Sequence, residues 1–153
     1  MIRRGVIQLK KILVATDGSE YSRRALKTAV DLARKFDSEI EILFVIRMPK
    51  EYDTNIYNYQ ILLEQIEEEG ERTIVATFEG TDLIGVTLKS KKLHGNPGNV
   101  IIQEVENENI DLVVMGSHIQ EFFRAGCDDY ISKPVDLGVL QRKLEEFIAR
   151  QEA

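Results

Sequence analysis

Cysteine and histidine are scarce in this chain, and each scarcity excludes a class of site. Cys127 is the only cysteine among 153 residues, so neither an intramolecular disulfide nor a CxxC metal or redox motif can form. The two histidines, His94 and His118, are too few for a histidine-rich metal site. The sequence therefore predicts no metal site and no required cofactor.

Long apolar runs and an excess of positive charge are also missing. No apolar stretch approaches the roughly 20 residues of a membrane-spanning helix, and the basic start MIRRGVIQLKK lacks the apolar segment of a signal peptide. The net charge of −6 and a pI near 5.1 oppose binding to nucleic acid, because contacts from Lys and Arg to phosphates supply most of that affinity. We expect a soluble cytoplasmic protein that binds neither nucleic acid nor a membrane.

The pattern of apolar residues predicts strands and helices in alternation. Buried strands are predicted at residues 11–15, a continuous apolar run, and at 39–46 and 111–115. A fourth strand is predicted at residues 86–93, where apolar and polar residues alternate as at a sheet edge. Helical spacing and capping residues predict helices at about residues 20–36, 56–84 and 97–107, the second stopped by Gly85. The remaining segment predicts a helix at 119–125, a short strand at 130–132 and a helix at 136–150. This alternation predicts one α/β domain over residues 1–153, with a doubly wound parallel sheet and helices on both faces.

Small and polar residues follow several of the predicted strands. In an open parallel sheet the ligand site lies outside the carboxyl ends of the strands. The residues expected at this edge are Thr16, Asp17, Gly18, Val45, Met115, Gly116, Ser117, His118 and Lys133. On spacing alone, Asp17-Gly18-Ser19 is more simply a strand-to-helix turn with a capping serine. Neither a GxGxxG motif nor a P-loop is present, so phosphate binding has no independent support.

Three stretches within residues 10–118 carry a family resemblance. KKILVATDGSEYSRRALKTAVDLARKF, EIEILFVI and LHGNPGNVIIQEVENENIDLVVMGSH resemble the universal stress protein family in order, content and spacing. In the ATP-binding branch of that family, the first-strand Asp with its neighbours and a valine of the second strand contact adenine and ribose, while a glycine-rich run after MGSH holds the phosphates. The resemblance implies a nucleotide site formed by Ala15, Thr16, Asp17, Val45, Met115, Gly116 and His118.

The chain departs from that family at Ile119. The family has glycine after the histidine and a second Gly-Ser motif ahead of its last strand, whereas this chain continues IQEFFRAGCDDYISKPV. The departure removes the phosphate-binding half of the site. The resemblance therefore implies at most weak ATP binding.

A second resemblance covers residues 125–148. AGCDDYISKPVDLGVLQRKLEEFI resembles the C-terminal end of response-regulator receiver domains, in which a lysine before a proline contacts a phosphoryl group on an aspartate. Only Lys133 and Pro134 carry over, and Gly116 rather than an aspartate follows the strand that ends at Met115, so phosphoryl transfer lacks its acceptor. The two resemblances predict a recombined or engineered hybrid, joined near residue 119, with five strands in the order 3-2-1-4-5.

We interpret the chain as a non-enzymatic hybrid domain whose nucleotide site lacks its phosphate-binding half and which has little or no activity. Two alternatives stay open: a competent ATP-binding universal stress protein, and a phosphate-responsive receiver-like domain. We also expect mainly a monomer, because Pro134 removes a hydrogen-bond donor from the predicted final strand. An adenine nucleotide is the one ligand that we expect.

Overall fold

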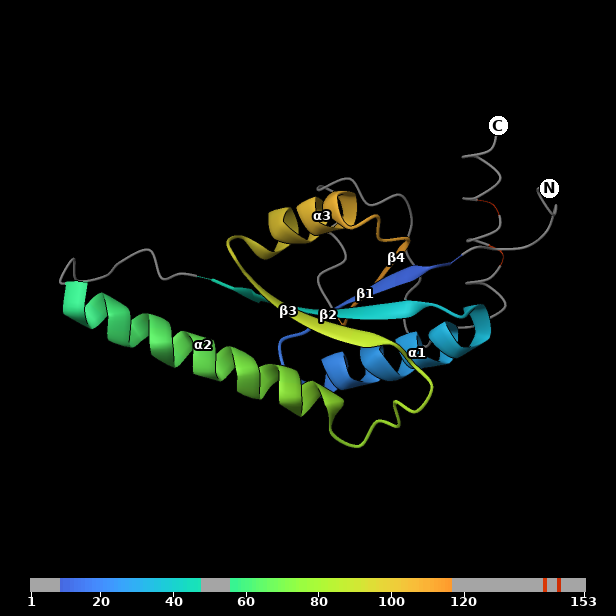
Figure 1. The fold of residues 1–153 in the computed structure, drawn as a ribbon, viewed down its shortest axis with the longest axis horizontal. Coiled ribbons are helices and arrows are strands. Elements are labelled where there is room, and N and C mark those ends of the chain that lie inside the picture. The colour runs from blue at the N-terminus through green and yellow to red at the C-terminus, as the bar shows by residue number, and fades with distance from the viewer. Residues whose placement is uncertain (1–8, 48–55, 117–141, 143–145, 147–153) are drawn as a thin grey trace. The chain divides into compact units, whose positions relative to one another are not determined.

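A computed structural model describes residues 9–47 and 56–116, together with residues 142 and 146 (Figure 1). The chain divides into two compact units, residues 9–117 and residues 1–8 with 118–153. In the second unit Arg142 and Glu146 are helical and exposed, in agreement with the helix predicted at 136–150. The helix predicted at 119–125 and the strand predicted at 130–132 lie outside the described residues. All other described structure belongs to the first unit.

Four parallel strands form the sheet: β1 (Lys11–Ala15), β2 (Glu39–Ile46), β3 (Leu88–His94) and β4 (Leu112–Val114). Their order, β3-β2-β1-β4, confirms the predicted order of the first four strands. The described sheet has four strands rather than the predicted five, because the segment predicted to supply the fifth is not among the described residues. β1 pairs with β2 on one side and β4 on the other, which places Ala15 opposite Leu43 and Val14 opposite Val114.

Helices cover both faces of the sheet. α1 (Glu20–Phe36) and α2 (Ile56–Phe78) lie on one face, and α3 (Pro97–Asn107) lies on the other (Figure 1). The crossover after β1 therefore departs to the opposite face from the crossover that leads into β4. β1 and β4 are neighbours, so the predicted topological switch point lies between them.

The core is built around the two central strands. Side chains with no solvent exposure come from β1 and β2, namely Ile12, Leu13, Val14, Ile40, Ile42 and Leu43. Because both faces of these strands are covered, β1 is apolar throughout after Lys11 and β2 is apolar from Ile42 to Ile46. Glu41 of β2 is the exception, since it is charged and nevertheless buried. From α1 the fully enclosed Leu26 packs against them, and burial of one leucine side chain contributes about 2 kcal/mol.

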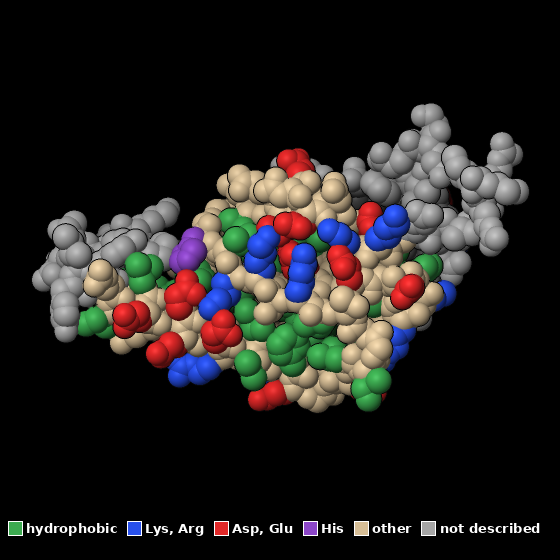
Figure 2. Space-filling model, in the orientation of Figure 1, with side chains coloured by type: hydrophobic (Ala, Val, Ile, Leu, Met, Phe, Trp, Pro, Cys, Tyr) green, Lys and Arg blue, Asp and Glu red, His purple; other side chains and the backbone are tan. Residues whose placement is uncertain are grey.

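β3 is the edge strand that the alternating pattern predicts, although it runs from Leu88 to His94 rather than from 86 to 93. Its side chains alternate between the two faces. Lys91 pairs with Glu104 of α3, whereas Lys92 pairs with Glu71 of α2, each at 2.7 Å. Figure 2 shows the resulting mixture of Lys, Arg, Asp and Glu side chains on the face that includes β3. Lysine side chains on an edge strand hinder pairing with a second chain.

α2 ends earlier than predicted. The helix was expected to continue to Ile84, but it stops at Phe78, and Gly80 rather than Gly85 is the first left-handed residue after it, with φ of 73°. Arg34 of α1 donates to the carbonyl oxygens of Asp82 and Ile84 at 3.0 and 3.2 Å, which holds the following segment in a turn. No described helix is long and apolar enough to cross a membrane.

Candidate functional site

The carboxyl ends of β2, β1 and β4 lie side by side and bring six of the seven predicted nucleotide-site residues to one edge. We call these six residues the carboxyl-edge site: Ala15, Thr16, Asp17, Val45, Met115 and Gly116. The seventh, His118, lies outside the described residues, as do Lys133 and Pro134. The strand order predicted from the sequence is what places them together.

The peptide that follows β1 forms a closed turn around one carboxylate. Ser19 is the N-cap of α1 and its hydroxyl accepts the N–H of Ser22 at 3.3 Å. Asp17 Oδ1 accepts the N–H of Ser19 at 2.9 Å and the hydroxyl of Ser22 at 2.7 Å. In return, the N–H of Asp17 donates to Ser22 Oγ at 3.0 Å. The strand-to-helix turn with a capping serine is therefore present, and it also fixes the orientation of the Asp17 side chain.

These hydrogen bonds determine the charge of Asp17. Partial burial alone would raise the pKa of the Asp17 carboxyl, but the hydrogen bonds from Ser19 and Ser22 outweigh it and hold the pKa below its usual range. The side chain is exposed, and Oδ2 accepts no hydrogen bond from the described residues. The edge thus presents an ionised carboxylate whose orientation is fixed through Oδ1.

A chain of hydroxyl groups joins α2 to this edge. Thr16 Oγ1 lies 2.6 Å from Thr77 Oγ1, and Thr77 Oγ1 donates to the carbonyl of Thr73 at 2.8 Å. Because Thr77 has only one hydroxyl proton, Thr16 must be the donor in the bond between the two hydroxyls. Thr16 Oγ1 also accepts the N–H of Gly18 at 3.0 Å, so α2 helps to hold the Asp17 turn.

Gly116 closes the other side of the edge. A Cβ atom at this position would lie 2.7 Å from Cβ of Tyr21 and 3.1 Å from its backbone carbonyl carbon. No larger residue fits unless the first turn of α1 moves. Glycine is therefore required here for the packing of β4 against α1, whether or not a ligand binds.

Thr73 and Thr77 were missed by sequence reasoning. They lie four residues apart within α2, where threonine among apolar positions is the only signal that the sequence offers. That signal is weak, because a threonine hydroxyl often bonds to its own helix. The bond from Thr77 to Thr16 depends on how α2 packs on the sheet.

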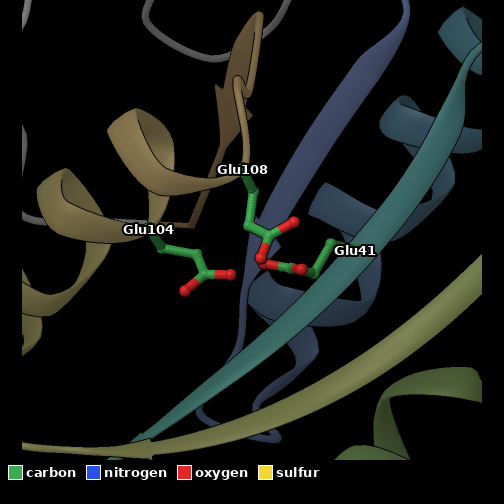
Figure 3. A group of neighbouring side chains, drawn as sticks. All are labelled: Glu41, Glu104 and Glu108. Carbon is green, nitrogen blue, oxygen red and sulfur yellow. The ribbon is translucent and has the colours of Figure 1, made fainter.

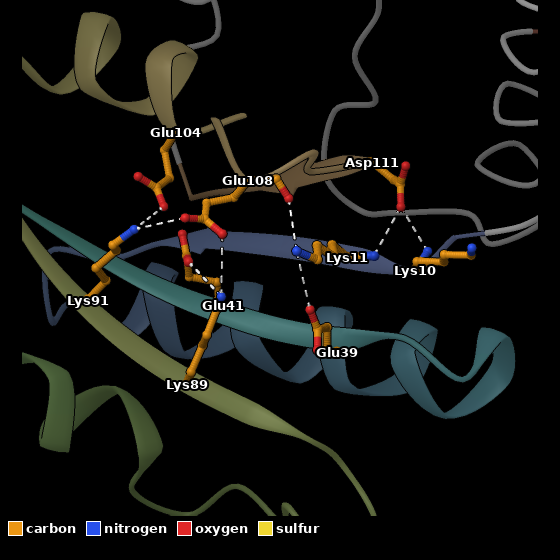
Figure 4. Close-up of polar contacts among 9 residues, drawn as sticks. All are labelled: Lys10, Lys11, Glu39, Glu41, Lys89, Lys91, Glu104, Glu108 and Asp111. Carbon is orange, nitrogen blue, oxygen red and sulfur yellow. Dashed lines mark hydrogen bonds and ion pairs between the residues drawn. The ribbon is translucent and has the colours of Figure 1, made fainter. Parts of the chain in front are cut away.

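A group of acidic side chains lies nearer the amino end of β2, against α3. Carboxylate oxygens of Glu41, Glu104 and Glu108 all lie within 4.8 Å of one another (Figure 3). Hard divalent cations prefer oxygen ligands, but the ammonium groups of Lys89 and Lys91 already lie among these carboxylates (Figure 4). We assign no metal to this group.

Comparisons with known proteins point to one family. A model of the Universal stress protein family matches residues 8–127. A universal stress protein of Methanocaldococcus jannaschii is 31% identical over 123 residues, which cover 76% of this chain and 69% of that protein. Another from Synechocystis sp. is 28% identical over 147 residues, covering 85% of this chain and 95% of that protein. A crystal structure of a universal stress family protein from Burkholderia pseudomallei superimposes with a TM-score of 0.65 at 26% identity, covering 78% of this chain and 92% of that one.

These matches extend past the predicted join. The family match continues to residue 127, and the Synechocystis alignment covers more of the chain than the part that precedes residue 119. One family therefore accounts for residues on both sides of that position. The alignments give no support to the predicted hybrid with a receiver-like fragment.

Proposed function

Because this chain belongs to the universal stress protein family, we propose that its carboxyl-edge site binds an adenine nucleoside and holds the attached phosphates only weakly. The observation that carries the proposal is the Asp17 carboxylate, which is ionised, exposed and fixed in orientation by Ser19 and Ser22. A carboxylate oxygen can accept hydrogen bonds from ribose hydroxyl groups. The half-buried side chains of Val45 and Met115 supply apolar surface for a base.

Weak phosphate binding follows from the residues after Gly116. Where the family resemblance implies a glycine-rich run, this chain has Ile119 and lacks the later Gly-Ser motif. Backbone N–H groups of such runs are what bind phosphate oxygens. Each charge-assisted hydrogen bond contributes about 1.5–3 kcal/mol, so the loss of several lowers the affinity for ATP by orders of magnitude.

Binding rather than catalysis is the proposed activity. A general base works best when its pKa lies near the operating pH, whereas the pKa of Asp17 is held below its usual range. The expected protein is a cytoplasmic monomer that senses or carries an adenine nucleoside. The experiment must distinguish this proposal from the alternative that the chain is a competent ATP-binding protein.

Isothermal titration calorimetry with adenosine and ATP tests the proposal. We expect similar dissociation constants for both ligands, within about threefold, because the phosphates add few contacts. Asp17→Asn should weaken adenosine binding at least tenfold, the effect of about 1.4 kcal/mol, while the amide oxygen still accepts the bonds from Ser19 and Ser22. Asp31→Asn is the matched control, since it removes the same charge from an exposed position of α1.

Three outcomes would contradict the proposal. Submicromolar ATP binding with much weaker adenosine binding would show that the phosphates are held after all. Equal losses in Asp17→Asn and Asp31→Asn would show a non-specific charge effect. Absence of adenosine binding at millimolar concentration would remove the site altogether.

A further inference from the structure

Glu41 is the most deeply enclosed ionisable side chain among the described residues. It is 2% exposed, and neither of its carboxylate oxygens receives a hydrogen bond. The nearest cation is Lys89, whose Nζ lies 3.5 Å from Glu41 Oε1 on a side chain that is half exposed. A buried carboxylate without a donor is costly, so another species must compensate for this one.

The ion pairs around Glu41 contain one more carboxylate than ammonium groups. Lys89 reaches Glu108 at 3.7 Å, and Lys91 lies 2.7 Å from Glu104 and 3.4 Å from Glu108 (Figure 4). Among the residues that the structure describes, two ammonium groups therefore form ion pairs with three carboxylates. The surplus falls where two buried side chains, Glu41 and Glu104, approach each other, because Glu108 is partly exposed and contacts both lysines.

Within residues 9–47 and 56–116, no ion pair joins a further cation to Glu41 or Glu104. Lys11 of β1 is 3.7 Å from Glu39 and donates to the carbonyl of Glu108 at 3.0 Å. Asp111, just ahead of β4, accepts the N–H groups of Lys10 and Lys11. Glu104 and Glu108 also lie at the C-terminal end of α3, where the helix dipole disfavours negative charge.

We propose that Glu41 and Glu104 share one proton, and that this proton keeps the last turn of α3 against β2, so that α3 loosens when the proton is lost. Two adjacent buried carboxyl groups cannot both ionise without strong repulsion. Burial raises the pKa of Glu41, and the adjacent Glu104 carboxylate raises it as well, whereas Lys91 and Lys89 lower it; the net result is a pKa of about 6. Loss of the proton thus falls just below neutral pH. The pair of Glu41 and Glu104 is separate from the carboxyl-edge site, because it lies nearer the amino end of β2.

Hydrogen exchange tests the proposal in the full chain. The N–H of Glu108 donates to the backbone carbonyl of Glu104 at 2.9 Å, and the N–H of Ile110 donates to the backbone carbonyl of Val105 at 3.0 Å, so both amides report on the end of α3. Their protection factors, which are corrected for the intrinsic pH dependence of exchange, should fall by about 15-fold between pH 4.5 and 7.5 for a pKa raised from 4.5 to about 6, because the carboxyl in the open state is already half ionised at pH 4.5.

Two variants separate the proton from a general charge effect. In Glu41→Gln the amide N–H donates to Glu104 as a protonated carboxyl does, so protection should stay high and independent of pH. Glu106→Gln removes an exposed charge from the same helix and should keep the fall seen in the wild type. If the protection factors fell equally with pH in the wild type and in Glu41→Gln, the proposal would be overturned.

A second measurement does not depend on the variants folding. Carboxyl ¹³C NMR of the wild type should show Glu41 titrating near pH 6, and a midpoint below 4.5 would overturn the proposal.

Addition of about 1 mM Ca²⁺ tests whether a bound cation, rather than a proton, neutralises the Glu41 and Glu104 carboxylates. If Ca²⁺ restores protection above pH 7 in the wild type but not in Glu41→Gln, a cation rather than a proton occupies the pair, and the proposal is wrong.

Discussion

Thr77 shows how one hydroxyl can support a distant turn. It is fully enclosed, and it accepts the one hydroxyl hydrogen of Thr16. Removing that acceptor leaves the Thr16 hydroxyl buried with an unsatisfied donor. The carboxyl-edge site therefore depends on a residue that contacts no predicted ligand.

We expect Thr77→Val to lower the free energy of unfolding by about 1–3 kcal/mol, the cost of a buried unsatisfied donor. Urea unfolding measures the change. Thr28→Val on α1 removes a hydroxyl that bonds only to the carbonyl of Arg24 at a more exposed position, and it should change stability by less than about 0.5 kcal/mol. Equal effects would show that the bond to Thr16 contributes nothing.

Gly116 gives a second prediction at the scale of single residues. Gly116→Ala should destabilise the protein by about 1–3 kcal/mol, the range for overpacking, because the new methyl group meets Tyr21 at 2.7 Å. Gly98→Ala, in the first turn of α3, meets nothing closer than 3.5 Å and should be neutral or slightly stabilising. Thermal unfolding compares the two variants, and a neutral Gly116→Ala would contradict the packing described for β4 and α1.

Among the elements, β3 and α3 are joined mainly through charged side chains. Lys91 donates to Glu104, which is 4% exposed, and this charge-assisted bond links the edge strand to the helix. The same bond raises the pKa of Lys91, so the ammonium remains charged at all physiological pH values. The contact between Lys91 of β3 and Glu104 of α3 is thus electrostatic.

Lys91→Met tests that link. The variant keeps the apolar stem but leaves Glu104 without its donor, so we expect a loss of about 1.5–3 kcal/mol, the range for bonds to charged groups. Lys27→Met, on the exposed face of α1, removes the same charge and should be nearly neutral. Chemical denaturation of both variants decides whether the loss belongs to the Glu104 contact or to the change in net charge.

At the scale of the whole molecule, stability depends on pH through contributions of opposite sign. The pKa values of Asp17, Glu67 and Glu108 are lowered by hydrogen bonds or ion pairs. Their contributions to the free energy of unfolding are therefore lost as the pH falls. Glu41 behaves in the opposite way, because its pKa is raised by burial. Its contribution to the free energy of unfolding is fully present below pH 4.5, the pKa of the carboxyl in the unfolded chain, and it is lost as the pH rises through about 6.

The contribution of Glu41 to the free energy of unfolding can be measured as the difference between the wild type and a variant without this carboxyl. Between pH 4.5 and 7, the unfolding free energy of the wild type should fall relative to that of Glu41→Gln by about 1–2 kcal/mol. Urea unfolding across this range measures the difference. A difference that is constant with pH would mean that Glu41 titrates normally in the folded protein.

Assembly is the remaining prediction at this scale. Pro134 lacks a backbone donor, and lysines line the edge strand β3, so both predicted edges of the sheet are poor templates for pairing. We expect a monomer at micromolar concentration by multi-angle light scattering. A stable dimer would contradict it.

Local sequence patterns predicted most of the elements because the forces involved are local. The capping serine and the spacing of Ala25, Leu26 and Ala29 placed α1 at Glu20–Phe36, as the structure has it. Buried runs placed β1 and β2, and the alternation of strands and helices brought Asp17, Val45 and Met115 to one edge. The end of α2 was wrong because two glycines could stop the helix, and contacts from Arg34 hold the segment after Gly80.

Composition and periodicity carry no information about which polar side chains meet across the fold. Thr16 meets Thr77, and Glu41 meets Glu104, only because α2 and α3 pack on opposite faces of the sheet at particular registers. These contacts then change the chemistry of the groups. The bond from Thr77 to the Thr73 carbonyl sets the direction of the hydroxyl bond, and burial raises the pKa of the Glu41 carboxyl. Sequence patterns therefore determined the order of elements and the residues at the carboxyl edge. Packing alone determined the hydroxyl chain and the paired glutamates, because desolvation acts on groups that are distant along the chain.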